Sequence, residues 1–249
     1  MAEGVTPRVV VPLALGGADR AWRFLLDLAN DPHVPPWVLV GGLMVELHAY
    51  EQGVVPVRVT NDADVLVDLF TDPAGTERVA AALVDRYGLS FDTPGPDGVG
   101  HRFRDGDLVV DVLAPDRLGP RTTTRTVPPA HTVRVPAGRR LLRDAEPVVV
   151  SYDGHESVMR RPRLIAAIIG KTRAHAVDTG RERERHLDDL ALLAGLITDP
   201  VAVAGRLTRG ERAAMRAASA LLPNSHPSWR RLPSPADARA ALRLLAHDE

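Results

Sequence analysis

Apolar residues in the first half of the chain recur with helix and strand spacings in turn. Helical spacing over residues 18–31 predicts a helix, which a cluster of prolines then ends. The apolar run at 37–40 predicts a short buried strand. Gly41 and Gly42 follow it, and the next residues again have helical spacing. A second strand is predicted at 64–70.

The same alternation continues downstream. Pro73 predicts the start of a helix that ends near Gly88. The apolar segments on either side of Gly106 predict a hairpin, and residues 148–150 predict one more strand. Strands and helices in this order predict an α/β (α+β) fold with a mixed sheet.

After Pro162 the pattern is helical to the end. Helices are predicted over residues 163–178, 182–197, 208–222 and 235–247. Gly180, Pro200 and Pro223 separate them. The sequence therefore predicts an α/β domain over 1–158, followed by a helical domain over 159–249.

Composition excludes several kinds of site. The chain has no cysteine, which rules out disulfides, thiolate zinc sites and a cysteine nucleophile. The N-terminal apolar run is short and contains Pro12, unlike a signal peptide. No apolar stretch approaches the roughly 20 residues that span a bilayer. A cytoplasmic protein with no membrane partner is expected.

The basic residues are unevenly placed. Residues 117–185 carry 15 Lys and Arg against 7 Asp and Glu, an excess of +8, so the rest of the chain sums to −9. Such a segment can attract a polyanion, or it can be an ordinary solvated arginine-rich surface. Of the 31 basic residues, only Lys171 is a lysine. Lysine is a compact point charge suited to a single phosphate oxygen, so this position is a candidate phosphate ligand.

The segment RVTNDADVLVD contains the strongest candidate for a metal site. On a strand, Asp62 and Asp64 lie on one face while Ala63 and Val65 face the core. Two adjacent carboxylates repel, and a divalent cation removes that repulsion. The alternative is a hydrated strand end. The glycine pair before the preceding helix could let a ligand approach the backbone, or could be a plain turn.

Asp111 is the third candidate metal ligand. It lies within the apolar strand LVVDVLA, where an ionised carboxylate is costly unless it is paired or metal-bound. A neighbouring strand could bring it beside Asp62 and Asp64, so that three carboxylates hold Mg²⁺. An ion pair with an arginine is the alternative.

The helical half supplies two more candidates. On a helix over 163–178, Lys171 shares a stripe with Leu164 and Ile168 and so points toward the other half of the protein. On the next helix Asp189 lies at the edge of the apolar stripe, whereas Asp188 points away. Asp189 could orient Lys171 or accept a proton from a hydroxyl nucleophile. The alternative is an ordinary ion pair between helices.

Together these features resemble the AbiEii-type nucleotidyltransferases, which include the MenT-type toxins of toxin–antitoxin pairs. The residues that match the family pattern are Gly41, Gly42, His48, Arg58, Thr60, Asp62, Asp64, Lys171 and Asp189-Leu190. They cover about a third of the chain, in the expected order. The chain departs from the pattern at Arg185 and His186, where the family often has Lys-Asp, and at Ala63, where it has a larger aliphatic residue.

The resemblance implies a nucleotidyltransferase fold whose helical region completes an active-site cleft. It implies transfer of a nucleotide from an NTP, with Mg²⁺ or Mn²⁺, to an acceptor that in relatives is the 3′ end of tRNA. Asp62 and Asp64 would hold metal, Lys171 would grip a phosphate, and Gly41, Gly42, Arg58 and Thr60 would bind nucleotide. A cognate antitoxin would be a possible partner. Two alternatives remain open: a small-molecule or protein hydroxyl as acceptor, and a homologue that binds without catalysing.

Overall fold

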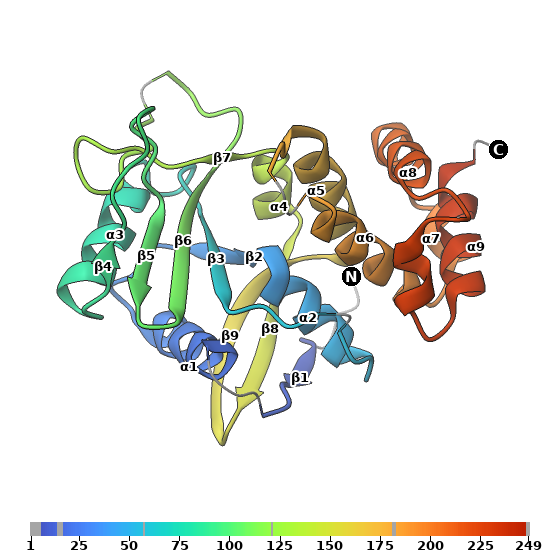
Figure 1. The fold of residues 1–249 in the computed structure, drawn as a ribbon, viewed down its shortest axis with the longest axis horizontal. Helices are drawn as coiled ribbons and strands as arrows, with labels where there is room; N and C mark the ends of the chain where they lie inside the picture. The colour runs from blue at the N-terminus through green and yellow to red at the C-terminus, as the bar shows by residue number, and fades with distance from the viewer. Residues whose placement is uncertain (1–5, 14–16, 57, 121, 181–182, 248–249) are drawn as a thin grey trace.

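The computed structural model describes residues 6–13, 17–56, 58–120, 122–180 and 183–247. They form an α/β part and, beside it, a helical part that carries the C-terminus (Figure 1). The predicted mixed α/β class with a helical C-terminal region is confirmed. In the described part of the chain, no helix has the length and apolarity that crossing a membrane requires.

The larger sheet carries the strands that matter for the site. Its path is β2 (Trp37–Val40), β3 (Asp62–Val67), β6 (Leu108–Pro115), β5 (Arg102–Asp105) and β4 (Ser90–Phe91), with β7 (Arg134–Val135) also paired to β6. Strands β3 and β6 are parallel, and the other pairs on this path are antiparallel. The parallel register sets Asp64 beside Asp111 and Leu66 beside Leu113.

The smaller sheet contains β1 (Arg8–Val10), β8 (Ala145–Tyr152) and β9 (His155–Pro162), in that order. Strand β1 runs parallel to β8, and β8 and β9 form an antiparallel hairpin. Strand β9 runs through the predicted boundary at residue 158, and the helical part begins after it.

Four helices belong to the α/β part: α1 (Gly17–Asn30), α2 (Gly41–Glu51), α3 (Gly75–Asp85) and α4 (Gly138–Arg143). Helix α1 is amphipathic and buries Trp22, Leu25 and Leu26. Helix α2 is buried from Gly42 to Ala49, and this stretch includes the polar residues Glu46 and His48. Polar side chains buried in this way need hydrogen-bond partners.

The helical part comprises α5 (Leu164–Val177), α6 (Arg185–Gly195), α7 (Pro200–Ala204), α8 (Arg209–Leu221), the 3₁₀ helix η1 (Pro227–Arg231) and α9 (Pro235–Ala246). Thr208 and Glu211 form a capping box that begins α8. Pro200 and Pro235 stand at the starts of α7 and α9, where the missing N–H costs nothing.

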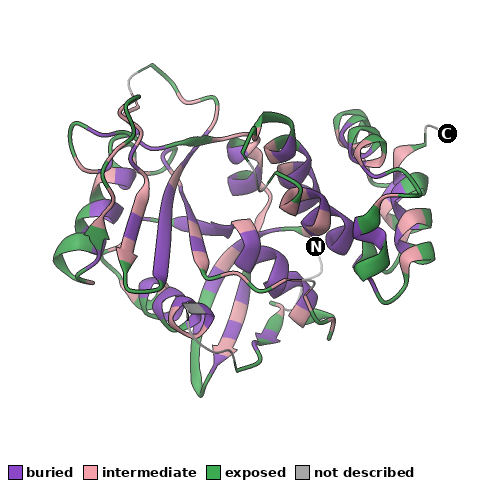
Figure 2. Ribbon diagram, viewed as in Figure 1, coloured by how far each residue is buried: buried purple, intermediate pink, exposed green. Residues whose placement is uncertain are grey.

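Two apolar clusters hold these parts together. The larger joins buried side chains from Val9 of β1 to Leu245 of α9, so the α/β and helical parts share one core. The smaller packs Val38, Val40 and Leu66 of the larger sheet against Leu141 of α4 and Ala166 of α5. Figure 2 shows the central strands and the inner faces of the helices buried, with exposure on the outer helix faces.

The predicted elements at 18–31, 37–40 and 64–70 correspond to α1, β2 and β3 within a few residues. The hairpin around Gly106 and the four C-terminal helices are also confirmed, although residues 181–182 lie outside the described residues. Strand β9, the short strands β1, β4 and β7, and helices α4 and α7 were not predicted.

Candidate active site

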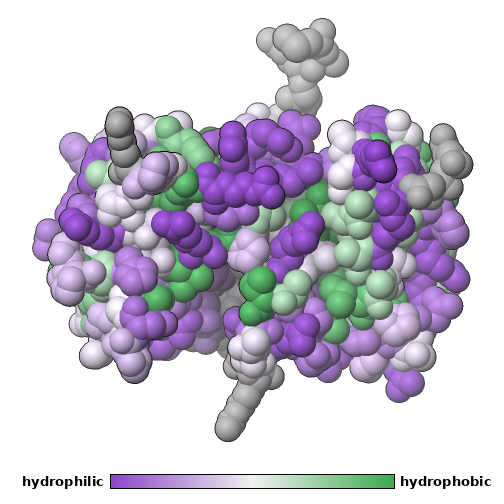
Figure 3. All heavy atoms as spheres, turned by 90° about the horizontal axis from the view of Figure 1, so that it is seen from above, coloured by the Kyte–Doolittle hydropathy of each residue, from purple (hydrophilic) through white to green (hydrophobic). Residues whose placement is uncertain are grey.

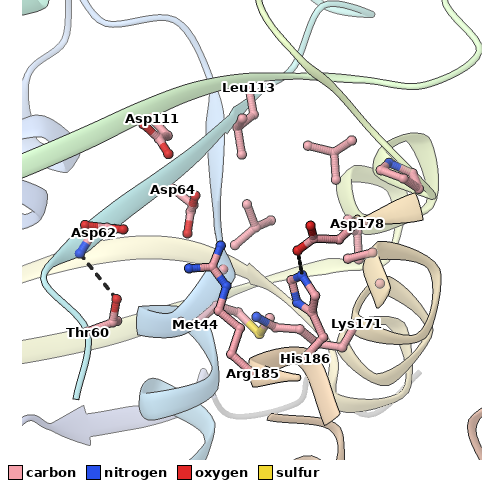
Figure 4. A pocket seen from close by; sticks show the side chains of 18 of the residues that line it. Met44, Thr60, Asp62, Asp64, Asp111, Leu113, Lys171, Asp178, Arg185 and His186 are labelled. Carbon is pink, nitrogen blue, oxygen red and sulfur yellow. Dashed lines mark hydrogen bonds and ion pairs between the residues drawn. The ribbon is translucent and has the colours of Figure 1, made fainter. Parts of the chain in front are cut away.

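A cavity of about 380 Å³ lies between the larger sheet and helices α5 and α6. Strand β3 and its neighbour β6 form one wall, and the start of α2 forms the floor. Figure 4 shows Asp62, Asp64 and Asp111 on the sheet side and Lys171, Arg185 and His186 on the helix side, where Asp178 is bonded to His186. Of the nine candidate site residues of the sequence, Asp189 does not line this cavity but bonds to Lys171, which does. The other eight line it: Gly41, Gly42, Arg58, Thr60, Asp62, Asp64, Asp111 and Lys171.

Asp62 and Asp64 are half-buried and point into the cavity from β3. Ala63 and Val65 between and beside them are fully buried in the core, as strand alternation requires. The backbone N–H of Asp62 donates to Thr60 Oγ1 at 3.3 Å, which fixes the approach to the strand. Among the described residues, neither carboxylate takes part in an ion pair or accepts a hydrogen bond. Both are therefore available to a ligand.

The environment of Asp64 disfavours its negative charge. Burial raises the pKa of this carboxyl to about 7, the neighbouring Asp111 and Asp62 add to the shift, and Lys171 opposes it. A cation bound here would remove this penalty.

Gly41 makes room for that carboxylate. It has φ +70°, and a Cβ built on it would lie 1.6 Å from Asp64 Oδ2. A Cβ on Gly42 would lie 2.6 Å from Thr60 Cγ2. The glycine pair thus lets α2 begin directly against Asp64 and Thr60. The sequence-based alternatives, backbone approach to a ligand and a plain turn, did not include this role.

Asp111 has a partner. Arg102, opposite it on β5, donates two hydrogen bonds to its carboxylate at 2.8 and 2.7 Å. The ion pair considered as the alternative to metal binding is therefore present. No group of three or more His, Cys, Asp or Glu side chains with metal-binding geometry occurs in the described part of the chain. Metal binding by Asp111 stays a prediction, and two carboxylates are free.

Lys171 and Asp189 form a buried ion pair on the helix side of the cavity. Lys171 Nζ donates to Asp189 Oδ2 at 2.6 Å, and the two side chains are 7% and 5% exposed. Arg58 donates to the same carboxylate at 3.2 and 3.1 Å. Burial by itself would raise the pKa of Asp189, but Lys171 and Arg58 hold it below its ordinary value. Asp189 thus ties helices α5 and α6 to the segment before β3.

Asp188 has no part in the cavity. Its carboxylate accepts from Ser228 Oγ at 2.6 Å and from Arg231 Nη1 at 2.7 Å, on the far side of α6. The choice of Asp189 over Asp188 from helical geometry agrees with these contacts.

Two residues of the site were not identified from the sequence. Glu46 of α2 is buried, and its Oε1 accepts the backbone N–H of Thr60 at 2.8 Å. Burial raises the pKa of Glu46 to about 7. The sequence contains a signal for this residue, because Glu46 is an acid within the otherwise largely apolar run LMVELHAY. Arg102 could have been found from the two-residue loop at Gly106, because that loop fixes the hairpin register opposite Asp111.

His48 lies outside the cavity. It is buried on α2, and its Nε2 donates to the backbone carbonyl of Pro162 at 3.0 Å. Burial lowers the pKa of His48 to about 3, so the ring is neutral at physiological pH. This histidine of the family pattern holds α2 against the end of β9.

Of the three positions at which the chain departs from the family pattern, Arg185 and His186 line the cavity, whereas Ala63 is buried in the core. Figure 4 shows the Arg185 guanidinium directed toward the side of the cavity that holds Asp62 and Asp64. His186 Nε2 bonds to Asp178 Oδ2 at 2.9 Å, and burial lowers the pKa of its ring. Arg185 thus keeps a positive charge where the family often has lysine.

No protein-family model, curated protein or solved structure matches this chain.

Proposed function

We propose that the chain is a metal-dependent nucleotidyltransferase that moves a nucleotide from an NTP to an acceptor. One observation carries this proposal: Asp62 and Asp64, whose carboxylates have no partner in the described part of the chain, face Lys171 across a single cavity. Carboxylates and cations that line one cavity suit a metal-bound triphosphate, because the metal needs acidic ligands and the phosphates need basic ones. The resemblance to AbiEii-type enzymes supports the same activity.

The free carboxylates fit a Mg²⁺ or Mn²⁺ ion. Mg²⁺ in phosphoryl-transfer sites is commonly held by one or two carboxylates plus phosphate oxygens, so a third protein carboxylate is not required. The raised pKa of Asp64 indicates that its negative charge is poorly compensated in this site, which favours a bound cation. When bound, the ion would polarise the phosphate under attack and stabilise the leaving oxygen.

The cationic residues would hold the triphosphate. Lys171 offers one compact charge to a phosphate oxygen, and Arg58 offers a planar fork. Their shared partner Asp189 keeps both charges in place before the nucleotide binds. Because its pKa is below the ordinary value, Asp189 is better suited to orient Lys171 than to accept a proton.

The surface beside the cavity favours an RNA acceptor, and tRNA is the acceptor that the resemblance suggests. Arg134 of β7 is exposed next to Val133 and Val135, which line the cavity, and Arg173 is exposed on α5. Neither arginine has an acidic partner among the described residues. Hydrophilic side chains predominate on the face seen in Figure 3. Exposed arginines can contact phosphates.

On this proposal the chain acts as the toxin of a toxin–antitoxin pair, and an antitoxin protein is its expected partner. Transfer to a small-molecule or protein hydroxyl is the second candidate, because the cavity itself does not select the acceptor. A homologue that binds nucleotide without catalysing is the third.

The test is incorporation of radiolabel from each of the four NTPs into a total tRNA pool with MgCl₂. We expect labelling by the protein and a loss of at least about 100-fold in Asp64→Asn, because removal of a transition-state charge contact costs about that much or more. Asp188→Asn is the matched control, since it removes an equivalent charge outside the cavity, and it should keep its activity. Label transferred only to proteins or small alcohols would support the second candidate. Absence of transfer to any acceptor would contradict the proposal that the protein is a nucleotidyltransferase.

Asp189 gives a second test within the same assay. Asp189→Asn weakens the anchor shared by Lys171 and Arg58 and leaves two cations near each other. We expect a rise in KM for the NTP and a loss of stability of about 3 kcal/mol, since breaking a buried ion pair leaves an uncompensated charge. An Asp189→Asn protein with unchanged stability and KM would show that the pair does not position Lys171.

A further inference from the structure

The cavity has a second end of different chemistry. Along β3 and β6 the cavity-side positions are first Asp64 and Asp111, then Leu66 and Leu113 two residues further on. Two strand residues span about 6.6 Å, so the wall changes from acidic to aliphatic over that distance. Leu66 is fully buried beneath α4, whereas Leu113 is partly exposed and lines the cavity.

Apolar residues also form the remaining walls of this end. Two come from the β7 segment and its continuation, one from α4, and two alanines and a glycine from the face of α5 next to Lys171. The residues, here called the aliphatic chamber, are Leu113, Val135, Pro136, Leu141, Ala167, Gly170 and Ala174.

Helix α5 supplies both the candidate phosphate ligand Lys171 and the small residues that leave room in the chamber. Ala167, Gly170 and Ala174 are three and four residues apart, so they share a face, and Lys171 lies at the edge of that face. A Cβ on Gly170 would lie 3.0 Å from Leu141 Cδ2, so this glycine brings α4 close to α5 and closes the back of the chamber. A ligand held by Lys171 at one end therefore extends over small aliphatic groups.

Side chains able to read a base by hydrogen bonds do not occur among the described residues of the chamber. It contains no amide, hydroxyl, charged or aromatic side chain. His186 and Asp178, at the cavity's margin, are bonded to each other. Selective recognition of one base requires such polar partners, whereas apolar walls discriminate only weakly.

We propose that the aliphatic chamber is the nucleobase subsite and that it accepts all four bases with similar affinity. The inference deepens the proposed function and rests on it. Burial of an apolar base face against aliphatic groups strengthens binding whichever base is present. The phosphates, held at the other end, fix the orientation of the nucleotide.

The first test is calorimetry of the full-length protein in MgCl₂ with ATP, GTP, CTP, UTP and inorganic tripolyphosphate. We expect dissociation constants of the four NTPs within about tenfold of one another, as apolar selectivity allows. Each NTP should bind at least about tenfold more tightly than tripolyphosphate, which has no base to bury.

A chamber-filling variant provides the second test. Ala174→Leu adds a side chain to the chamber, and Ala176→Leu adds the same side chain at an exposed position of α5 outside the cavity. We expect Ala174→Leu to weaken all four NTPs by at least about tenfold and to leave tripolyphosphate unchanged. Ala176→Leu should change neither.

The outcomes separate the two proposals. If neither tripolyphosphate nor any NTP binds, the proposed function fails and the chamber's role with it. If NTPs bind no better than tripolyphosphate, or one base is preferred by more than about tenfold, the inference is overturned while the proposed function stands. An Ala174→Leu protein with normal NTP affinities would also overturn it. If that variant does not fold, the comparison of five ligands on the unaltered protein decides.

Discussion

Gly41 lies where the carboxylate of Asp64 occupies the space of a missing side chain. Two independent properties require glycine there: a positive φ of +70° and a Cβ position 1.6 Å from Asp64 Oδ2. Gly88 shares only the first property, with φ +71° and no atom within 4 Å of a built Cβ. A comparison of substitutions at Gly41 and Gly88 therefore distinguishes the effect of backbone strain from the effect of displacing the Asp64 carboxylate.

We predict that Gly41→Ala loses at least about 100-fold in nucleotide transfer, because a shift of about 1 Å in a reacting group can cost that much. Both Gly41→Ala and Gly88→Ala should lose about 1–2 kcal/mol from the left-handed backbone, as measured by urea unfolding. Gly88→Ala should keep its activity. Equal activity in the two variants would mean that the position of Asp64 does not matter.

At the scale of elements, the sequence predicts those with a regular apolar pattern and misses those without one. Strand β9 is missed because its inward side carries Ser157, Met159 and Arg161, so the alternation of apolar and polar residues disappears. The burial of Arg161 is explained by its tertiary partners, Glu51 on α2 and Glu146 on β8. Helix α4 spans six residues, too few for a period to be visible.

The site residues likewise divide into those that a regular pattern identifies and those that depend on tertiary contacts. Asp62, Asp64 and Lys171 were identified because strand and helix periods place them on the cavity side. Whether Asp111 would meet a metal or an arginine depended on its partner on β5, so both alternatives stayed open at the sequence level. The aliphatic chamber combines β6, β7, α4 and α5, and only tertiary packing brings those elements together.

The hydrogen bond from His48 to Pro162 joins two such elements, α2 and β9, and it should make the fold sensitive to acid. The native ring has a pKa of about 3, whereas the unfolded ring has an ordinary value of about 6.5. Between these values the unfolded state binds more protons, so stability falls as pH falls. We predict that lowering the pH from 7 to 5 removes about 2 kcal/mol of stability through His48.

The matched variant is His48→Gln, whose amide can still donate to the carbonyl of Pro162 but does not titrate. Urea unfolding at both pH values should show a smaller loss in His48→Gln than in the unaltered protein, by about 2 kcal/mol. His175 and His186 also have lowered pKa values, but they are present in both proteins and cancel. Equal losses would place the acid sensitivity elsewhere.

At the scale of the whole molecule, the α/β and helical parts are not independent. One apolar cluster runs through both, and Asp189 of α6 binds Arg58 from the segment before β3. The cavity lies at the junction of the two parts. A ligand that bridges the cavity should therefore stabilise a single cooperative unit.

We predict one transition in scanning calorimetry, with equal calorimetric and van't Hoff enthalpies. An NTP with Mg²⁺ at 100 times its dissociation constant should stabilise the whole unit by about 2.7 kcal/mol. Asp64→Asn should also unfold in one transition. Without metal it should be the more stable protein, because the like charges of Asp64 and Asp111 no longer repel. Addition of Mg²⁺ should stabilise it less than the unaltered protein. Two transitions, only one of them shifted by the nucleotide, would show that the parts unfold separately and that one of them binds the ligand alone.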